Sequence, residues 1–204
     1  MYKQKYSSQL LEKAVDEFAS LPGIGRKSAL RLALHLLKQP VENVNRFGNS
    51  FIALRNGVKY CSNCNMITDD NMCSVCSDTH RDKSVICVVE SIRDFLSIEN
   101  TGQYNGLYHV LGGIISPMDG IGPADLSIDK LIERVNNQDV SEVILALSTS
   151  MEGETTSFFL YKKLSELNVK VSTIARGVGF GDDLEYTDEF TLGKSIENRH
   201  TFKL

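Results

Sequence analysis

Apolar residues in the first 60 positions recur at the spacing of amphipathic helices. This periodicity predicts three helices, over residues 8–19, 26–38 and 41–56. The Leu-Pro-Gly-Ile-Gly segment at residues 21–25 separates the first two, because proline and glycine interrupt a helix. The sequence therefore predicts an all-helical module at the start of the chain.

From residue 84 the pattern changes to short apolar runs rich in β-branched residues, which are typical of buried parallel strands. Helical patterns separate these runs, which occupy residues 84–90, 107–113, 140–148 and 169–175. The alternation of strands and helices with short connections predicts an open α/β sheet with mainly parallel strands. Residues 176–204 follow as a tail with its own glycines.

Four cysteines lie between these two regions, in two C-x-x-C pairs with eight residues between the pairs: Cys61, Cys64, Cys73 and Cys76. A C-x-x-C turn directs two sulfurs at one point, so two such turns supply the tetrahedral thiolate shell that zinc prefers. No further His, Asp or Glu stands out as a ligand. We therefore expect one structural Zn²⁺ per chain and no catalytic metal at this cluster.

Two disulfides, or redox-active C-x-x-C pairs, are the alternatives for the same cysteines. The first residues lack the apolar run of a signal peptide, which favours a reducing cytoplasm over an oxidising compartment. Neither pair has the strand-to-helix setting of a thioredoxin-like site. The sequence thus favours zinc and a cytoplasmic location.

The distribution of charge changes the meaning of the net charge, which is −4 over 204 residues. Residues 1–60 carry ten Lys and Arg against four Asp and Glu, whereas the rest of the chain is acidic. The hydrophobic content of 42% is ordinary for a globular protein, and no apolar stretch is long enough to span a membrane. Phosphate contacts, if the protein makes them, are therefore expected near the start of the chain.

The segment around Gly23 and Gly25 provides a candidate for such contacts. The two glycines allow a tight turn and a close approach to another surface, and Arg26, Lys27 and Arg31 open the helix that follows. Free N–H groups at the start of a helix suit a phosphate. The segment resembles a helix-hairpin-helix motif, which implies sequence-nonspecific DNA binding; the alternative is an ordinary helical turn with solvated basic residues.

Carboxylates follow two of the predicted strands. Glu90 ends the first strand and Asp94 follows one helical turn later, while Glu152 and Glu154 come after the third strand. Because the carboxyl ends of parallel strands share one edge of a sheet, these groups are expected to converge on a crevice. Clusters of this kind hold Mg²⁺ for phosphoryl transfer.

The same region resembles a Toprim domain, a family that pairs a strand-end Glu with a D-x-D-x-x-G stretch. Glu90 and Gly153 match that pattern, but Ser148 and Ser150 occupy the two aspartate positions. Hydroxyls are poor replacements for carboxylates around a hard dication. We therefore expect a Toprim-like fold without catalysis, in which the remaining acids, Glu90, Asp94, Glu152 and Glu154, contact a partner.

Taken in order, these segments resemble the RecR family of bacterial recombination mediators. The fold class expected is α+β and multi-domain. Its parts are a helix-hairpin-helix module (1–56), a four-cysteine zinc finger (57–80), a Toprim-like α/β domain with a mainly parallel sheet (81–175) and a glycine-rich, Walker-B-like tail (176–204). The family match implies a non-enzymatic, nucleoid-associated protein of DNA repair.

The resemblance also implies partners. Family members form dimers, rings or clamps around single-stranded, gapped or double-stranded DNA, and work with RecO and often RecF to load RecA onto single strands. Candidate oligomer interfaces are the apolar face of the first helix and the tail: Leu10, Leu11, Val15, Phe18, Phe190 and Leu192. Two other functions stay open, a Mg²⁺-dependent Toprim nuclease or primase-like enzyme and a zinc module that binds only proteins.

Overall fold

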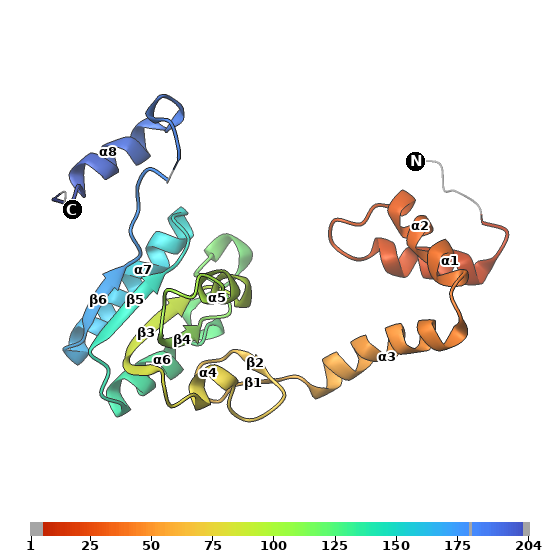
Figure 1. The fold of residues 1–204 in the computed structure, drawn as a ribbon, viewed down its shortest axis with the longest axis horizontal. Helices are drawn as coiled ribbons and strands as arrows, with labels where there is room; N and C mark the ends of the chain where they lie inside the picture. Colours follow the sequence, from red (N-terminus) through yellow and green to blue (C-terminus); the bar gives the residue numbers. More distant parts are fainter. Residues whose placement is uncertain (1–5, 180, 202–204) are drawn as a thin grey trace. The chain divides into compact units, whose positions relative to one another are not determined.

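The computed structural model describes residues 6–179 and 181–201, coloured along the chain in Figure 1. The chain divides into two compact units, Met1–Val58 and Lys59–Leu204. Two of the sequence-predicted domains, 1–56 and 176–204, include residues outside the described part (1–5, 180 and 202–204). No described helix is both long and apolar enough to cross a membrane.

The first unit consists of three helices, α1 (Gln9–Ala19), α2 (Arg26–Leu37) and α3 (Val41–Gly57). Its small core joins Val15 of α1 to Ala29 and Ala33 of α2, and Leu11 and Phe18 pack against these three. The apolar face of α1, expected from the sequence to be an intermolecular interface, is therefore largely used inside the unit. Leu10 is the exception, because its side chain is exposed.

Helix α3 has no buried residue along its 17 residues. Phe47 and Phe51 meet edge to face on its surface, and Ile52 and Leu54 are also exposed. A helix usually owes its stability to the packing of its apolar face. This surface of α3 is therefore a stronger candidate for an intermolecular contact than α1.

The second unit begins with the cysteine-bearing segment, which we call the knuckle (residues 59–78). It contains a short antiparallel pair, β1 (Lys59–Tyr60) and β2 (Ile67–Thr68), and a one-turn helix, α4 (Ser74–Ser77). The periodicity of the sequence did not predict this pair because its strands are two residues long.

A four-stranded parallel sheet forms the centre of this unit: β3 (Asp82–Val89), β4 (Gly106–Val110), β5 (Glu142–Ala146) and β6 (Lys170–Thr173). The strand order is β4-β3-β5-β6, which leaves β4 at one edge. The sequence prediction of a parallel α/β sheet is therefore confirmed.

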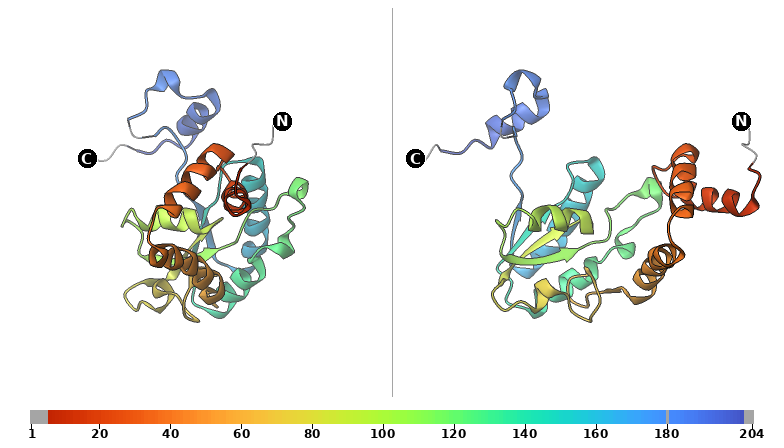
Figure 2. Two further views of the ribbon diagram at one scale, coloured as in Figure 1. Left: turned by 90° about the vertical axis from the view of Figure 1, so that its right-hand side faces the viewer. Right: turned by 45° about the vertical axis from the view of Figure 1, so that its right-hand side comes forward.

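Two different layers cover the two faces of the sheet. Alternate residues such as Ile86 and Val88 pack in one cluster with residues of α6 (Ile128–Asn137) and α7 (Met151–Leu164). Figure 2 shows the ribbon of these helices and strands from two further directions. The intervening residues, such as Cys87 and Val89, face α5 (Ile92–Glu99) and also the four cysteines of the knuckle. The knuckle therefore shares a hydrophobic core with the α/β domain.

The described part of the tail contains regular structure that its glycine content does not predict. After a 3-10 turn, η4 (Leu184–Tyr186), the chain forms a further helix, α8 (Glu189–Glu197). Asp188 begins α8 by accepting a hydrogen bond from the Thr191 amide at 2.9 Å. The sequence analysis missed this helix, although an aspartate before a helical pattern is a strong capping signal.

His109, a buried residue of β4, makes the stability of the α/β domain depend on pH. Its Nε2 donates to the carbonyl oxygen of Ser127 at 2.7 Å, and burial lowers the pKa of the imidazole to about 4. An unfolded histidine has a pKa of about 6.5, so protonation favours the unfolded chain. The contribution is fully present above pH 6.5 and is lost as pH falls towards 4.

We therefore expect His109 to account for a loss of about 2 kcal/mol in unfolding free energy between pH 7 and pH 5. Urea titrations of the parent protein and of His109→Gln at the two pH values test this, since the variant lacks the titrating group. His80→Gln is the control, because the His80 side chain is 92% exposed. Equal pH dependence in all three proteins would contradict the assignment.

Candidate metal centre and nucleic-acid interface

The knuckle brings the four cysteines together as a candidate metal centre. The Sγ atoms of Cys61, Cys64, Cys73 and Cys76 all lie within 4.8 Å of one another, and those of Cys64 and Cys73 are 3.5 Å apart. Four thiolates around zinc at about 2.3 Å lie about 3.8 Å from one another. The side chains are buried and free of disulfides, so the geometry fits a closed tetrahedral zinc site and not the two disulfides considered above.

Local backbone geometry explains this convergence. Asn65 follows the first C-x-x-C pair with a left-handed φ of 62°, which reverses the chain and allows the Cys61 amide to donate to the Met66 carbonyl at 2.7 Å. The amide of Cys73 donates to the Cys61 sulfur at 3.4 Å. An N–H that points at a sulfur favours the thiolate form, which is the form that binds metal.

The close approach of Cys64 and Cys73 also moves the pKa values of the two thiols in opposite directions. A hydrogen bond from Cys64 lowers the pKa of Cys73 to about 2, and the same pairing raises the pKa of Cys64. In this pair the Cys64 thiol donates and keeps its proton, while the accepting Cys73 sulfur is the first to ionise. A metal must displace the remaining thiol protons to bind all four sulfurs, and it then holds them together, so metal binding and the folding of the knuckle are linked.

The hairpin between α1 and α2 is the candidate nucleic-acid interface. Gly23 adopts a positive φ of 80°, and the Ile24 amide donates to the Leu21 carbonyl at 3.1 Å, which closes the turn. Gly25 precedes α2 without a side chain that could cap the helix. The first N–H groups of α2 therefore have no side-chain acceptor at this cap and are available to a phosphate.

The basic residues of α2 divide into two groups. Lys27 and Arg31 line one shallow hollow together with His35 and Lys38, and Leu30 and Leu34 line it as well. Arg26 instead forms an ion pair with Asp16 of α1 at 2.8 Å. The structure thus places Lys27 and Arg31 on a common surface and assigns Arg26 to the junction between α1 and α2.

Two residues of this surface, His35 and Lys38, were not predicted as DNA contacts from the sequence. Both are exposed, and Lys38 lies one helical turn beyond His35. Their positions eight and eleven residues after Lys27 place all four on one helical face. That periodicity was the available signal in the sequence.

The acids expected to converge at the sheet have separate roles. Asp94 caps α5, because its Oδ2 accepts the Ser91 amide at 2.9 Å and the Ser91 hydroxyl at 2.7 Å. Glu154 forms an ion pair with Arg176. Glu90 follows β3, and Glu152 lies in the first turn of α7. Within the described part of the chain, only the four cysteines place three or more metal-binding side chains together.

Two serine hydroxyls, those of Ser148 and Ser150, lie together in the loop between β5 and α7. The Oγ atoms of Ser148 and Ser150 lie 3.1 Å apart, and Ser150 caps α7 by accepting the Gly153 amide at 3.0 Å. A side chain at Gly153 would place its Cβ 2.1 Å from the Ser148 carbonyl oxygen, so this turn requires glycine. The loop is thus organised by capping and close packing.

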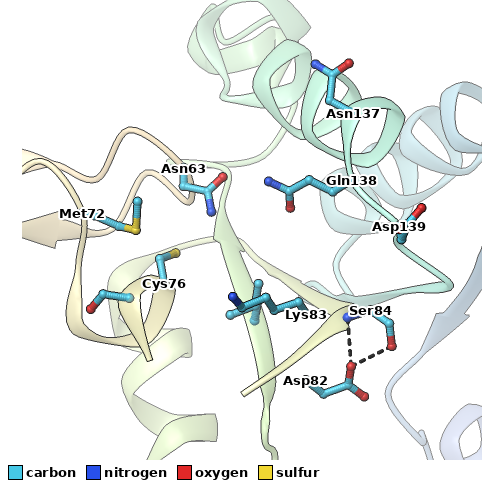
Figure 3. A pocket seen from close by; sticks show the side chains of 11 residues that line it. Asn63, Met72, Cys76, Asp82, Lys83, Ser84, Asn137, Gln138 and Asp139 are labelled. Carbon is cyan, nitrogen blue, oxygen red and sulfur yellow. Dashed lines mark hydrogen bonds between the residues drawn. The ribbon is translucent and has the colours of Figure 1, made fainter. Parts of the chain in front are cut away.

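An open polar cavity lies at the other end of the strands, where β3 begins. Figure 3 shows that the Gln138 side chain extends from the end of α6 towards the knuckle, where Asn63 and Cys76 lie. Lys83 and Asp82 line the same cavity from β3. No pattern in the sequence indicated this cavity, because it forms between segments that are distant along the chain.

Comparison with known families assigns each segment. Four family models match: the helix-hairpin-helix of RecR (residues 11–54), the RecR zinc finger domain with four cysteines (58–78), the Toprim domain (84–175) and the C-terminal segment of RecR (177–200). The zinc-finger match covers the four clustered cysteines, so one structural Zn²⁺ is the cofactor.

Curated relatives match over almost the whole chain. A protein named Recombination protein RecR from Porphyromonas gingivalis is 61% identical over 199 residues, which is 98% of this chain and 96% of the relative. Proteins of the same name from Bacteroides fragilis and Flavobacterium johnsoniae are 59% and 52% identical, and each match covers 98% of this chain and 97% of the relative.

Proposed function

The chain belongs to the RecR family of recombination proteins, and on that premise we propose that it is a DNA-binding recombination mediator in DNA repair. In this proposal it acts in the cytoplasm, at the nucleoid, as an oligomeric clamp that works with RecO, and also with RecF, to load RecA onto gapped or single-stranded DNA. The observation that carries the proposal is that Lys27 and Arg31 lie on one surface of a helix-hairpin-helix module.

The proposed DNA contacts are sequence-nonspecific. Gly23 and Gly25 shape the turn, Lys27 and Arg31 contact phosphates, and Arg26 assists by tying the start of α2 to α1 through Asp16. Backbone amides and basic side chains that bind phosphates carry no information about base sequence. Single-stranded, gapped and double-stranded DNA are all expected to bind.

We propose that the chain is not an enzyme. The alternative, a Mg²⁺-dependent Toprim nuclease or primase-like enzyme, requires carboxylates where Ser148 and Ser150 lie.

The acids nearby, Glu90, Asp94, Glu152 and Glu154, are proposed to contact a protein partner such as RecO. The zinc finger, with Cys61, Cys64, Cys73 and Cys76 as ligands, then has a structural role. We also propose that the chain has four domains, with boundaries after residues 56, 80 and 175.

The function is tested by loading RecA onto gapped DNA covered by single-strand-binding protein, with RecO present. We expect the protein to accelerate the appearance of RecA filaments, and to leave the DNA uncut after incubation with Mg²⁺. Cleavage that depends on Mg²⁺ and is abolished in Glu90→Gln would favour the nuclease. Loading that is equally fast without the protein would contradict the mediator.

Oligomerisation is the next expectation, because one hairpin with a few phosphate contacts binds DNA weakly, and linked copies raise the effective affinity. We expect a dimer or tetrameric ring, with the exposed face of α3 and the tail around Phe190 in the interfaces. Light scattering should show a lower mass for Phe47→Ser/Phe51→Ser than for Met118→Ser, which removes a 96% exposed side chain elsewhere. A parent protein that is monomeric at high concentration would contradict the clamp.

A further inference from the structure

Arg134 of α6 carries a buried positive charge. The residue is only 5% exposed. Among the residues that the structure describes, no carboxylate lies within ion-pair distance of it, in contrast to the partly buried Arg81, which pairs with Glu99. A buried charge is costly unless an opposite charge and hydrogen bonds compensate it.

The hydrogen bonds of Arg134 go to neutral groups. Its Nη1 donates to the Tyr108 carbonyl at 2.7 Å, and its Nε donates to the Gln138 side-chain oxygen at 3.3 Å. Its Nη2 is buried and has no hydrogen-bond partner within the described residues. These contacts fix the direction of the guanidinium but supply no negative charge.

Arg134 and the knuckle both contact the outer edge of the sheet, which is strand β4. Tyr108 and Val110 are alternate residues of the edge strand β4, so their outward main-chain groups point away from β3. Arg134 donates a hydrogen bond to the Tyr108 carbonyl, and the Val110 amide donates one to the Cys64 carbonyl at 2.8 Å. The Asn65 side chain donates to the Val110 carbonyl at 3.1 Å. Arg134 and the cysteine cluster are therefore neighbours along one strand edge.

Two further observations agree with this placement. Burial lowers the pKa of Arg134, while Coulombic attraction to each of the four cysteines opposes that shift. In Figure 3, the Gln138 side chain, which accepts from Arg134, reaches towards Asn63 and Cys76 of the knuckle. All four cysteines, which can carry negative charge, therefore lie near enough to Arg134 to interact with its guanidinium.

We propose that Arg134 is the counter-ion of the zinc tetrathiolate. Four thiolates exceed the charge of Zn²⁺ by two, so a bound metal leaves a buried dianion that needs a cation. The guanidinium meets this need from α6, on the opposite face of the sheet from α5. Arg134 thereby ties retention of the metal by the knuckle to the packing of the α/β domain.

The test measures the zinc affinity by competition with a chromophoric chelator, for the full chain and three variants. Arg134→Met removes the charge, Arg134→Lys retains it, and Arg81→Gln is the control, since it removes a partly buried charge that already has a carboxylate. We expect zinc to bind at least about 10-fold more weakly to Arg134→Met, and within about 3-fold of the parent for Arg134→Lys and Arg81→Gln. Parent-like affinity in Arg134→Met would overturn the proposal.

A thermal measurement separates a counter-ion from a residue that only stabilises the fold. For the counter-ion, the rise in melting temperature on adding zinc to chelator-treated protein is smaller in Arg134→Met than in the parent, because the metal-free variant no longer buries an unpaired charge. For a purely structural arginine, the variant melts lower by the same amount with and without zinc, which would contradict the proposal.

A second cycle covers the case in which Arg134→Met does not fold. Cys76→His replaces one thiolate by a neutral ligand, and Cys76 borders the cavity, where the larger ring has room. With Cys76→His in place, Arg134→Gln is expected to weaken zinc binding less than it does in the parent. If Arg134→Gln weakens zinc binding equally in the parent and in Cys76→His, Arg134 does not act through its charge, and the proposal is overturned.

Discussion

Replacing Cys64 by alanine is expected to release the zinc and to destabilise the α/β domain together with the knuckle. A structural zinc site couples metal binding to folding, so three remaining cysteines leave the knuckle without its main source of stability. The knuckle covers one face of the sheet beside Val89 and Val110. We expect the melting temperature to fall by roughly 10 °C, which corresponds to about 3–5 kcal/mol for a chain of this size.

Elemental analysis and thermal unfolding measure the two parts of this expectation. Cys87→Ala is the matched control, because Cys87 is buried in the same cluster but lies outside the four-sulfur group. It should keep one zinc per chain and lose less stability than Cys64→Ala. A parent protein with no zinc and two disulfides by mass spectrometry would rule out the metal centre.

The double substitution Lys27→Ala/Arg31→Ala is expected to weaken DNA binding strongly while the protein folds normally. Both side chains are exposed on the hollow of α2, so their removal leaves the small core around Val15 intact. A charge-assisted hydrogen bond contributes about 1.5 kcal/mol or more, which is roughly 10-fold in affinity for each contact. The slope of log K against log salt should fall by about 1.4–1.8 for the pair.

Fluorescence anisotropy with labelled DNA over a series of salt concentrations gives both quantities. Lys162→Ala/Lys163→Ala changes the net charge equally in α7 of the α/β domain, and it should retain the affinity and the slope of the parent. If the two double variants behave alike, the basic face of α2 is merely solvated. A loss that varies with DNA sequence would contradict nonspecific phosphate binding.

The features that the sequence predicted well are those determined by nearby residues. The C-x-x-C spacing is enough to place Cys61 and Cys64 on one turn, because each turn is closed by its own backbone. The hairpin at Gly23 is equally local. The parallel sheet followed from continuous apolar runs, which require cover on both faces.

Contacts between distant segments were not predictable in this way. The ion pair of Arg26 with Asp16 depends on the packing angle between two helices, and the sequence of neither helix predicts that angle. The sequence analysis also treated the knuckle as separate from the sheet, because nothing in its spacing shows that its sulfurs pack beside Cys87. Arg134 looks like an ordinary polar position of an amphipathic helix.

One missed role did have a local signature. Asp94 was assigned to a possible metal crevice, yet Ser91 and Asp94 stand at the positions of a capping box at the start of α5. Asp94 was grouped with the other acids because of its proximity to a strand end, and that grouping took no account of the capping requirement of the helix. Helix caps should therefore be assigned before acids near strand ends are grouped into sites.

The way in which the knuckle and Arg134 occupy the outer side of β4 bears on solubility. An uncovered edge strand presents a row of free main-chain groups to which a strand of another molecule can add. Here the Tyr108 carbonyl already accepts a hydrogen bond from Arg134, and both main-chain groups of Val110 are bonded, to Cys64 and to Asn65. Zinc, by holding the knuckle in place, thus protects the edge from intermolecular strand addition, and metal-depleted protein is expected to aggregate through β4.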